Sequence, residues 1–135
     1  MTPEEITAST ILLDLDDTLY PRSSMLLPYI SARIARHLQR TLRIPHSQAD
    51  SIRMHYMEKY GSTLAGLINQ EHIDPDDFTK YVYDINYQQF IDNSQSLKLL
   101  LNRFKQRKIV YTNGARIHAE HVLSSLGVDN VVDGI

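Results

Sequence analysis

Two acidic residues, Asp14 and Asp16, follow a short apolar run near the start of the chain. The run, Thr10–Leu13, is continuous and β-prone, which is the pattern of a buried parallel strand that ends in its acids. If the chain continued as a strand, the two carboxylates would point the same way and would repel each other without a cation between them. Mg²⁺ prefers hard oxygen ligands and bridges them to phosphate. The pair therefore predicts a magnesium site for a phosphate group.

The same two carboxylates can do covalent chemistry. A carboxylate can attack phosphorus and form an aspartyl-phosphate, and we expect Asp14 to be this nucleophile. Asp16, displaced along the chain, is then placed to protonate the leaving oxygen and later to activate water. The alternative is that the acids only form a polar turn, as most isolated Asp-x-Asp pairs do. The apolar run before Asp14, and Thr18-Leu19-Tyr20 after it, favour the chemical interpretation.

A second apolar run, Lys108–Thr112, ends in a hydroxyl group and an Asn-Gly turn. The sequence predicts another buried strand here, followed by a tight turn. We expect Thr112 to hold a phosphate oxygen, with Asn113 and the amide of Gly114 approaching the same group. Ligands of open α/β sheets bind beyond the carboxyl ends of the strands, so these residues and the two acids are expected at one edge.

The elements that must position these residues are of two kinds, an all-helical stretch and an α/β stretch. Apolar residues at helical spacing fill the stretch between the two predicted strands, and they predict a small all-helical unit over residues 22–90. A helix, the second strand, a helix over Arg116–Leu126 closed by Gly127, and a third strand from Val131 then follow. This order predicts an α/β fold with a partial Rossmann-like parallel sheet. The expected core is residues 1–21 with 91–135, and residues 22–90 are an inserted helical cap.

The motifs resemble those of the haloacid dehalogenase (HAD) superfamily of phosphatases and hydrolases. Asp14-Leu15-Asp16-Asp17-Thr18 is similar to the first motif of that family, and Thr112 is similar to its second. The resemblance implies a phosphoric monoester hydrolase with Asp14 as nucleophile, Asp16 as general acid and base, and Thr112 as phosphate binder. It also implies the backbone carbonyl of Asp16 as a ligand of the metal, for which Mg²⁺ is expected. The helical insert resembles a cap placed directly after the first motif.

Three further segments resemble the pyrimidine 5′-nucleotidase-like branch of that superfamily. They are Leu19-Tyr20-Pro21, Tyr60–Leu67, and Thr112-Asn113-Gly114 with His118-Ala119. The resemblance implies a small phosphorylated metabolite as substrate, with a nucleoside 5′-monophosphate as the narrower class. Candidate substrate or cap contacts are Tyr60, Gly61, Thr63 and His118. The alternative for Tyr60–Leu67 is a plain turn between helices, and Tyr87 is expected to pack within the cap.

The sequence departs from the family pattern after Thr112. The third motif of the family is a lysine or arginine and the fourth is acidic, yet no lysine follows Thr112 and the one arginine is Arg116. The later acids, Glu120, Asp129 and Asp133, lack the expected placement. We therefore expect a chain truncated at its C-terminus, which leaves a second function open: an inactive relative with a binding or assembly role. An exposed, incomplete core would then favour a homo-oligomer.

Composition excludes several other classes of protein. The 135 residues contain no cysteine, which excludes disulfides, thiol catalysis and cysteine-based metal sites. The formal net charge of -2 gives no global attraction to nucleic acid or to an anionic membrane. Residues 1–10 lack a signal-peptide profile, and no apolar run approaches the length of a membrane span. The expected location is cytoplasmic, without a nucleic-acid or membrane partner.

Overall fold

The computed structural model describes residues 7–135 and divides the chain into two compact units. One unit comprises the residues up to Leu26 together with Asn86–Ile135, and the other comprises Leu27–Ile85. Residues 1–6 lie outside the described residues. They are the first part of the stretch, residues 1–10, for which the sequence predicts no signal peptide. The architecture is a mixture of α-helices and a small parallel sheet, as the sequence predicts.

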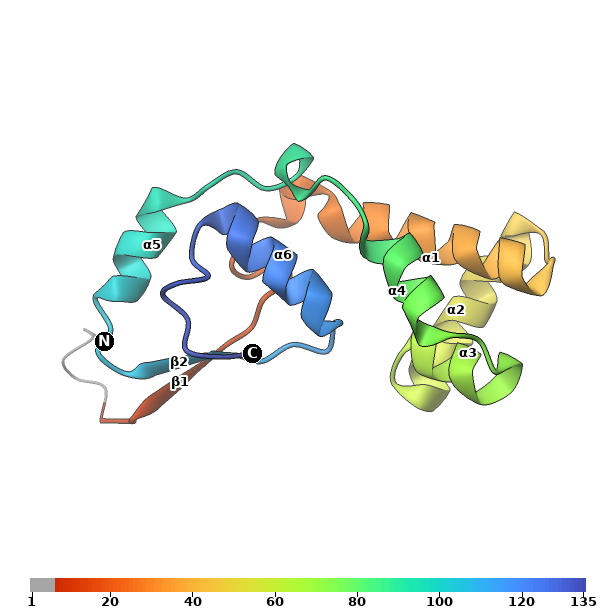
Figure 1. Cartoon of the computed structure of the whole chain (residues 1–135), viewed down its shortest axis with the longest axis horizontal. Helices are drawn as coiled ribbons and strands as arrows, with labels where there is room; N and C mark the ends of the chain where they lie inside the picture. The colour runs from red at the N-terminus through yellow and green to blue at the C-terminus, as the bar shows by residue number, and fades with distance from the viewer. Residues whose placement is uncertain (1–6) are drawn as a thin grey trace. The chain divides into compact units, whose positions relative to one another are not determined.

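The first unit contains the parallel sheet and two helices (Figure 1). Strand β1 (Thr10–Leu13) pairs in parallel with β2 (Arg107–Val110), in a register that sets Leu13 beside Val110. The amide of Tyr111 donates to the carbonyl of Leu13 at 2.8 Å, so the two strands also end side by side. The remaining elements are α5 (Gln95–Asn102), α6 (Arg116–Leu126) and the 3-10 turns η2 (Arg22–Ser24) and η3 (Tyr87–Gln89).

Local sequence signals fix the ends of the two helices in this unit. The side chain of Ser94 accepts a hydrogen bond from the amide of Leu97 and so caps the start of α5. Helix α6 ends at Gly127, which has a φ of 73° in the left-handed region that glycine adopts readily. Its amide donates to the carbonyls of Leu123 and Ser124. The predicted bounds of α6 are therefore confirmed.

The predicted third strand is reduced to a single bridge. Ile109 forms an isolated parallel bridge with Gly134, and the amide of Val110 donates to the carbonyl of Gly134 at 2.8 Å. Beside this bridge, the Asp133 carboxylate accepts a hydrogen bond from the amide of Lys108 at 2.7 Å. A backbone N–H group of β2 thus donates to a side chain and not to the backbone of a third strand. Within residues 7–135, the regular sheet therefore has two strands rather than three.

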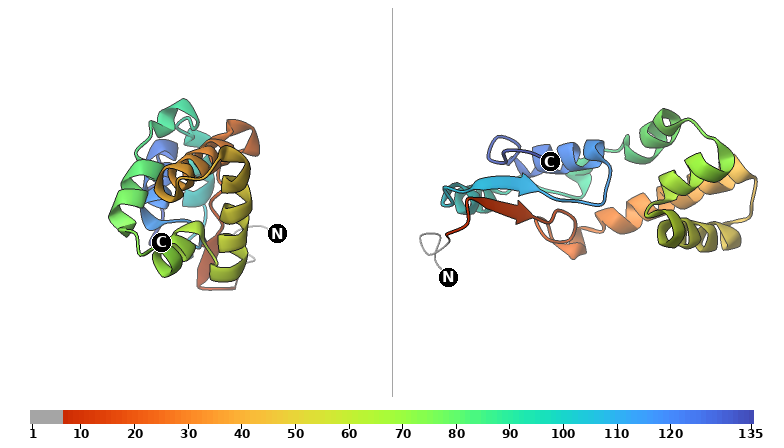
Figure 2. Two further views of the ribbon diagram at one scale, coloured as in Figure 1. Left: turned by 90° about the vertical axis from the view of Figure 1, so that its right-hand side faces the viewer. Right: turned by 90° about the horizontal axis from the view of Figure 1, so that it is seen from below.

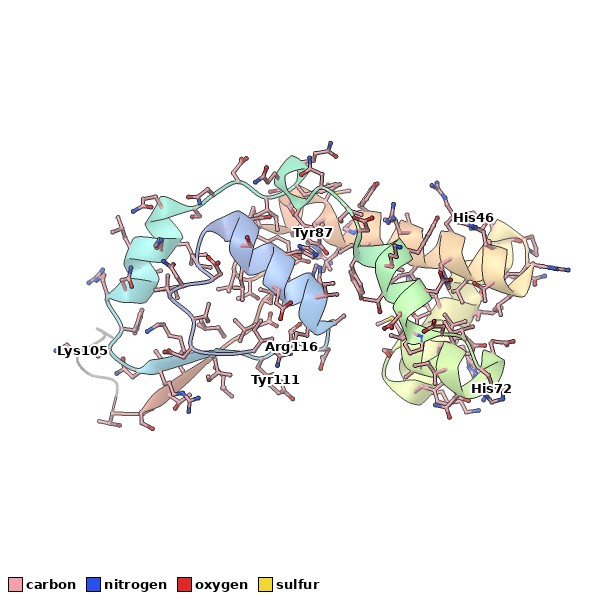
Figure 3. The ribbon with its side chains drawn as sticks, in the orientation of Figure 1. His46, His72, Tyr87, Lys105, Tyr111 and Arg116 are labelled. Atoms are coloured by element: carbon pink, nitrogen blue, oxygen red, sulfur yellow. The ribbon has the colours of Figure 1, made fainter. Side chains whose placement is uncertain are left out.

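The prediction that the strands are buried is wrong for one face of the sheet. Val110 is buried, as is the inner side of α6, whereas Leu12 is 65% exposed and Tyr111 is 68% exposed. Figures 1 and 2 show α5 and α6 on the same side of the strands, and Figure 3 shows Tyr111 on the opposite side. Right-handed crossovers that advance in one direction place their helices on one face, so the other face keeps its apolar side chains accessible.

The second unit contains four helices. They are α1 (Leu26–Leu42), α2 (His46–Tyr60), α3 (Thr63–Glu71) and α4 (Pro75–Tyr83). Asp74 caps α4 by accepting from the amide of Asp76, with proline as the first helical residue. The buried apolar side chains of this unit include Leu38, Leu67, Phe78 and Val82. Among the described residues, no helix is both long enough and apolar enough to span a membrane.

Candidate active site

The loop after β1 presents Asp14 to solvent. The carbonyl of Leu15 accepts hydrogen bonds from the amides of Thr18 at 3.2 Å and Leu19 at 2.9 Å, which folds the chain back after the strand. Asp17 takes a left-handed φ of 57° in this turn, a conformation that aspartate tolerates better than most residues. The hydroxyl of Thr18 donates to the exposed Asp14 carboxylate at 2.5 Å. This contact orients the predicted nucleophile without covering it.

Asp16 lies two residues further on and is held by two donors. The hydroxyl of Tyr20 donates to Oδ1 of Asp16 at 2.6 Å, and Nε2 of His118 lies 2.7 Å from the same oxygen. Burial alone would raise the pKa of Asp16, but the hydrogen bond and charge of His118, with the Tyr20 hydrogen bond, lower it below the ordinary 3.8. Asp16 is therefore a carboxylate at neutral pH, the form that can activate water.

Each acid has its own hydrogen-bond partner. Thr18 stabilises the carboxylate of Asp14, whereas Tyr20 and His118 stabilise that of Asp16. The sequence predicts a cation between these acids because two neighbouring carboxylates repel each other. In the structure these separate donors stabilise the charges, so repulsion alone does not call for a metal ion.

His118 is held on its other side as well. Its Nδ1 lies 3.0 Å from the hydroxyl of Tyr87, and the Tyr87 ring stacks on His121 with centroids 4.9 Å apart. Tyr87 belongs to η3 in the α/β unit, so the expectation that it packs within the cap is wrong. Its placement against α6 is visible in Figure 3. No local pattern in the sequence pointed to Tyr87, because its partner is far away along the chain.

The turn after β2 brings the predicted phosphate-binding residues to the same place. The amide of Gly114 donates to Oγ1 of Thr112 at 3.0 Å. A Cβ added at Gly114 would lie 3.3 Å from Oγ1 of Thr112, 3.5 Å from Cδ2 of His118 and 3.7 Å from Oδ2 of Asp16. Thr112, Gly114, His118 and Asp16 therefore surround one small space, and Asn113 lies exposed beside it.

The predicted cap residues have local structural roles in the helical unit. Gly61 ends α2 with a φ of 82°, and the hydroxyl of Ser62 caps α3 by accepting from the amide of Ala65. Thr63 is buried at the start of α3, and the hydroxyl of Tyr60 accepts from the side-chain amide Nε2 of Gln70 at 2.7 Å. Locally the segment is thus a turn between helices. A substrate contact by Tyr60, Gly61 or Thr63 stays a prediction.

Two cations of the α/β unit are held by main-chain carbonyls. Nζ of Lys108 donates to the carbonyls of Phe104 and Gln106, at 3.0 and 2.9 Å. Arg116 donates to the carbonyl of Ile135 at 2.7 Å. The Arg116 side chain also lines a surface cavity of about 340 Å³ with Asp129, Asp133 and their neighbours. Main-chain carbonyls therefore bind both of these charges.

The exposed carboxylate of Asp14 is compatible with a role as a magnesium ligand. Within residues 7–135, no group of three or more histidine and acidic side chains is arranged to hold a metal. Oδ1 of Asp16 already accepts two hydrogen bonds, while Asp14 is exposed and accepts one from Thr18. Mg²⁺ commonly binds through one or two carboxylates, with water and substrate phosphate as its other ligands. Asp14 fits that role, and metal binding by Asp14 and Asp16 stays a prediction.

Comparison with known proteins includes a distant similarity to a yeast protein. No family model matches the chain. The chain is 24% identical over 131 residues to Phosphate metabolism protein 8 of Saccharomyces cerevisiae (strain ATCC 204508 / S288c). The alignment covers 90% of this chain and 41% of the yeast protein. The chain thus spans about two fifths of the length of this relative.

Proposed function

We propose that the α/β unit carries the phosphate-handling part of a HAD-like phosphatase, with Asp14 as its nucleophile. The observation that carries the proposal is the space at Gly114, where Asp16 and Thr112 meet from the ends of two parallel strands. Two side chains assigned to one reaction from separate motifs thus lie against the same glycine. The distant similarity to a protein named for phosphate metabolism supports the same class of chemistry.

The proposed reaction has two halves. In the first, an oxygen of Asp14 attacks phosphorus, the bond from phosphorus to the leaving oxygen breaks, and that oxygen takes a proton from the acid form of Asp16, which leaves Asp16 as the carboxylate. In the second, Asp16 takes a proton from water, whose oxygen attacks phosphorus and frees the Asp14 carboxylate as phosphate departs. The hydroxyl of Thr112 and the nearby backbone hold the phosphate oxygens during both halves.

The proposed cofactor is Mg²⁺, held by the exposed carboxylate of Asp14 and, as the family resemblance implies, by the backbone carbonyl of Asp16. The chemistry supplied by a bound Mg²⁺ is neutralisation of the charge shared by Asp14 and the phosphate. The proposed substrate is a small phosphorylated metabolite. A nucleoside 5′-monophosphate is the narrower proposal, and it rests on the resemblance of Thr112-Asn113-Gly114 and His118-Ala119 to one branch of the superfamily.

The test is release of phosphate from p-nitrophenyl phosphate with and without Mg²⁺. We expect Asp14→Asn to abolish the Mg²⁺-dependent rate, because an amide cannot act as the nucleophile. The matched control is Asp17→Asn, which changes an exposed acid three residues away. Its φ of 57° is one that asparagine also adopts readily, so the loop should keep its shape. Equal, background rates for the wild type and Asp14→Asn would contradict the catalytic proposal.

The exposed face of the sheet favours a second candidate, a role in binding or assembly. Leu12 and Tyr111 leave apolar surface accessible on the side away from α6. Association through this face would remove it from water. Light scattering of the wild type and of Leu12→Ser separates the cases: a concentration-dependent oligomer that Leu12→Ser weakens supports assembly. A monomer at every concentration contradicts it.

A further inference from the structure

Four side chains of the α/β unit form a continuous hydrogen-bonded chain. Tyr20 donates to Asp16, Asp16 contacts Nε2 of His118, and Nδ1 of His118 contacts the hydroxyl of Tyr87. The four residues come from three separate segments: the loop after β1, helix α6 and η3. Hydrogen bonds that join three segments restrict the rotation of each side chain more than a hydrogen bond between two residues of one helix does.

The histidine at the centre of this chain has little freedom. The residue is 2% exposed, and both ring nitrogens meet polar partners. A rotation of the ring would break both contacts and leave buried polar atoms without their partners, which is costly. When Nδ1 accepts the proton of the Tyr87 hydroxyl, the neutral ring carries its own proton on Nε2 and donates it to Asp16. The contact with Tyr87 therefore determines that Nε2 of His118 is the donor to Asp16.

This arrangement distinguishes the two oxygens of the Asp16 carboxylate. Oδ1 accepts from Tyr20 and is in contact with His118, at 2.6 and 2.7 Å. Oδ2 lies 3.7 Å from the place of a Cβ at Gly114, on the side where Oγ1 of Thr112 also lies. One oxygen is thus anchored, and the other faces the space proposed for the phosphate.

We propose that His118 is a positioning residue that holds Oδ1 of Asp16 and thereby presents Oδ2 to the substrate, with Tyr87 fixing the ring of His118. The proposal rests on the function proposed above and adds two residues to it. Proton transfer requires the donor or acceptor atom within hydrogen-bond reach of the reacting oxygen. A misplacement of about 1 Å can lower a rate about 100-fold. Loss of the anchor should therefore affect turnover more than substrate binding.

Three variants separate the contacts. His118→Leu removes both hydrogen bonds, and we expect kcat for p-nitrophenyl phosphate with Mg²⁺ to fall about 10- to 100-fold with little change in KM. His118→Gln keeps an amide donor near the position of Nε2 and should recover part of the loss. Tyr87→Phe removes the distant hydroxyl but keeps the ring beside His121, so its loss should be smaller than that of His118→Leu.

Two controls separate positioning from general damage. His37→Leu makes the same change at the buried histidine of the helical unit and should leave kcat of the folded protein unchanged. In an Asp16→Asn background, His118→Leu should have no further effect on kcat, because the group that it positions is already lost. If His118→Leu lowered kcat in the Asp16→Asn background as much as in the wild type, the proposal would be overturned. It would also be overturned if the fall in kcat caused by His118→Leu were no larger than the fall in the fraction of folded protein.

A second readout does not depend on activity. Long-range ¹H–¹⁵N spectra of the imidazole report which nitrogen carries the proton, and we expect Nε2–H for wild-type His118. The ring signals should change in Asp16→Asn and in Tyr87→Phe but not in Asp14→Asn. Unchanged signals in Asp16→Asn would overturn the proposed anchor. If the wild type lacks Mg²⁺-dependent activity but these shifts occur, the proposed function fails while the contact between His118 and Asp16 stands.

Discussion

The two units of the chain each bury a histidine, and the surroundings of the two rings differ. His118 in the α/β unit is 2% exposed and has Asp16 at 2.7 Å and Tyr87 at 3.0 Å. His37 in the helical unit is 6% exposed. Its Nδ1 lies 3.2 Å from the hydroxyl of Thr41, and its Nε2 lies 3.9 Å from a carboxylate oxygen of Asp77, which is 85% exposed.

The difference extends to the other polar groups of each unit. In the helical unit, the Arg33 guanidinium donates to the carbonyls of Tyr81 and Val82 at the end of α4, and its charge lies over the Tyr81 ring. These contacts satisfy a helix end and add to packing. In the α/β unit, polar side chains contact one another around an open space. Burial of a histidine therefore does not indicate chemistry unless its partners are side chains that face such a space.

Two glycines give the same contrast. A Cβ at Gly114 would enter the space between Thr112 and Asp16, where the nearest atom, Oγ1 of Thr112, lies 3.3 Å away. A Cβ at Gly66 in α3 would lie 2.2 Å from Cγ of Tyr56 in α2, closer than atoms can approach. Gly114 leaves the proposed phosphate space open, whereas Gly66 lets two helices touch. Alanine at each position should therefore damage different properties.

Gly114→Ala should have the largest effect, and it should act on activity alone. The backbone at Gly114 is outside the left-handed region, so alanine is tolerated there, and the free energy of unfolding should change by less than about 0.5 kcal/mol. The added methyl occupies the proposed phosphate space, so kcat/KM with p-nitrophenyl phosphate should fall about 100-fold. Gly134→Ala in the same unit is the control. Retained activity in Gly114→Ala would place the phosphate elsewhere.

Gly66→Ala should do the reverse by lowering stability. The methyl must displace the Tyr56 ring or separate α2 from α3, and overpacking of this kind costs about 1–3 kcal/mol. Urea unfolding followed by circular dichroism measures the loss. Gly66→Ala with Tyr56→Ala should lose less than the sum of the two single changes, because the smaller side chain makes room for the methyl. Additive losses would mean that the two residues are not in contact.

The sequence predicted the parts of this comparison that depend on local patterns. Helical periodicity and capping residues gave the helices, and the two strands followed from apolar runs that end in polar residues. The position of Thr112 near Asp16 was also predictable, because parallel strands end at one edge of a sheet. The contact of Tyr87 with His118 was not predictable, since it depends on how η3 packs against α6.

Two other predictions failed because they depend on what surrounds an element. The apolar pattern of Thr10–Leu13 suits burial on both faces, but only the face toward α6 is covered within residues 7–135. The run from Val131 is β-prone, yet it forms a single bridge because the Asp133 side chain takes a donor of β2. Local sequence does not encode which element packs against a given face of the sheet. It also does not encode whether a backbone donor of a strand bonds to a side chain or to the backbone of a neighbouring segment.

Loss of a helix cap should be a smaller effect, and it tests whether the two units unfold separately. Ser62 caps α3 in the helical unit, and Ser94 caps α5 in the α/β unit. Changing either to alanine should cost about 1 kcal/mol. If the units unfold separately, hydrogen exchange should accelerate in the helical unit for Ser62→Ala and in the α/β unit for Ser94→Ala. Acceleration of the whole chain by either change would show one cooperative unit.

The smallest expected effect is the pH dependence contributed by His37. Burial lowers the pKa of His37 below the ordinary 6.5, Arg40 lowers it further, and Asp77 partly offsets both. As the pH falls below 6.5, the unfolded chain binds a proton at this histidine before the folded chain does, so the folded state loses stability. The contribution is therefore fully present above pH 6.5 and is lost as the pH falls through the lowered pKa.

Replacing His37 with glutamine should reduce this dependence. Urea unfolding of the wild type and His37→Gln between pH 8 and pH 5 measures the two slopes, and the variant should lose less stability on acidification. The corresponding change in the other unit lies outside this pH range, because the lowered pKa of Asp16 places its loss of stability below pH 3.8. Equal slopes for the wild type and His37→Gln would mean that His37 is as accessible to protons in the folded protein as in the unfolded chain.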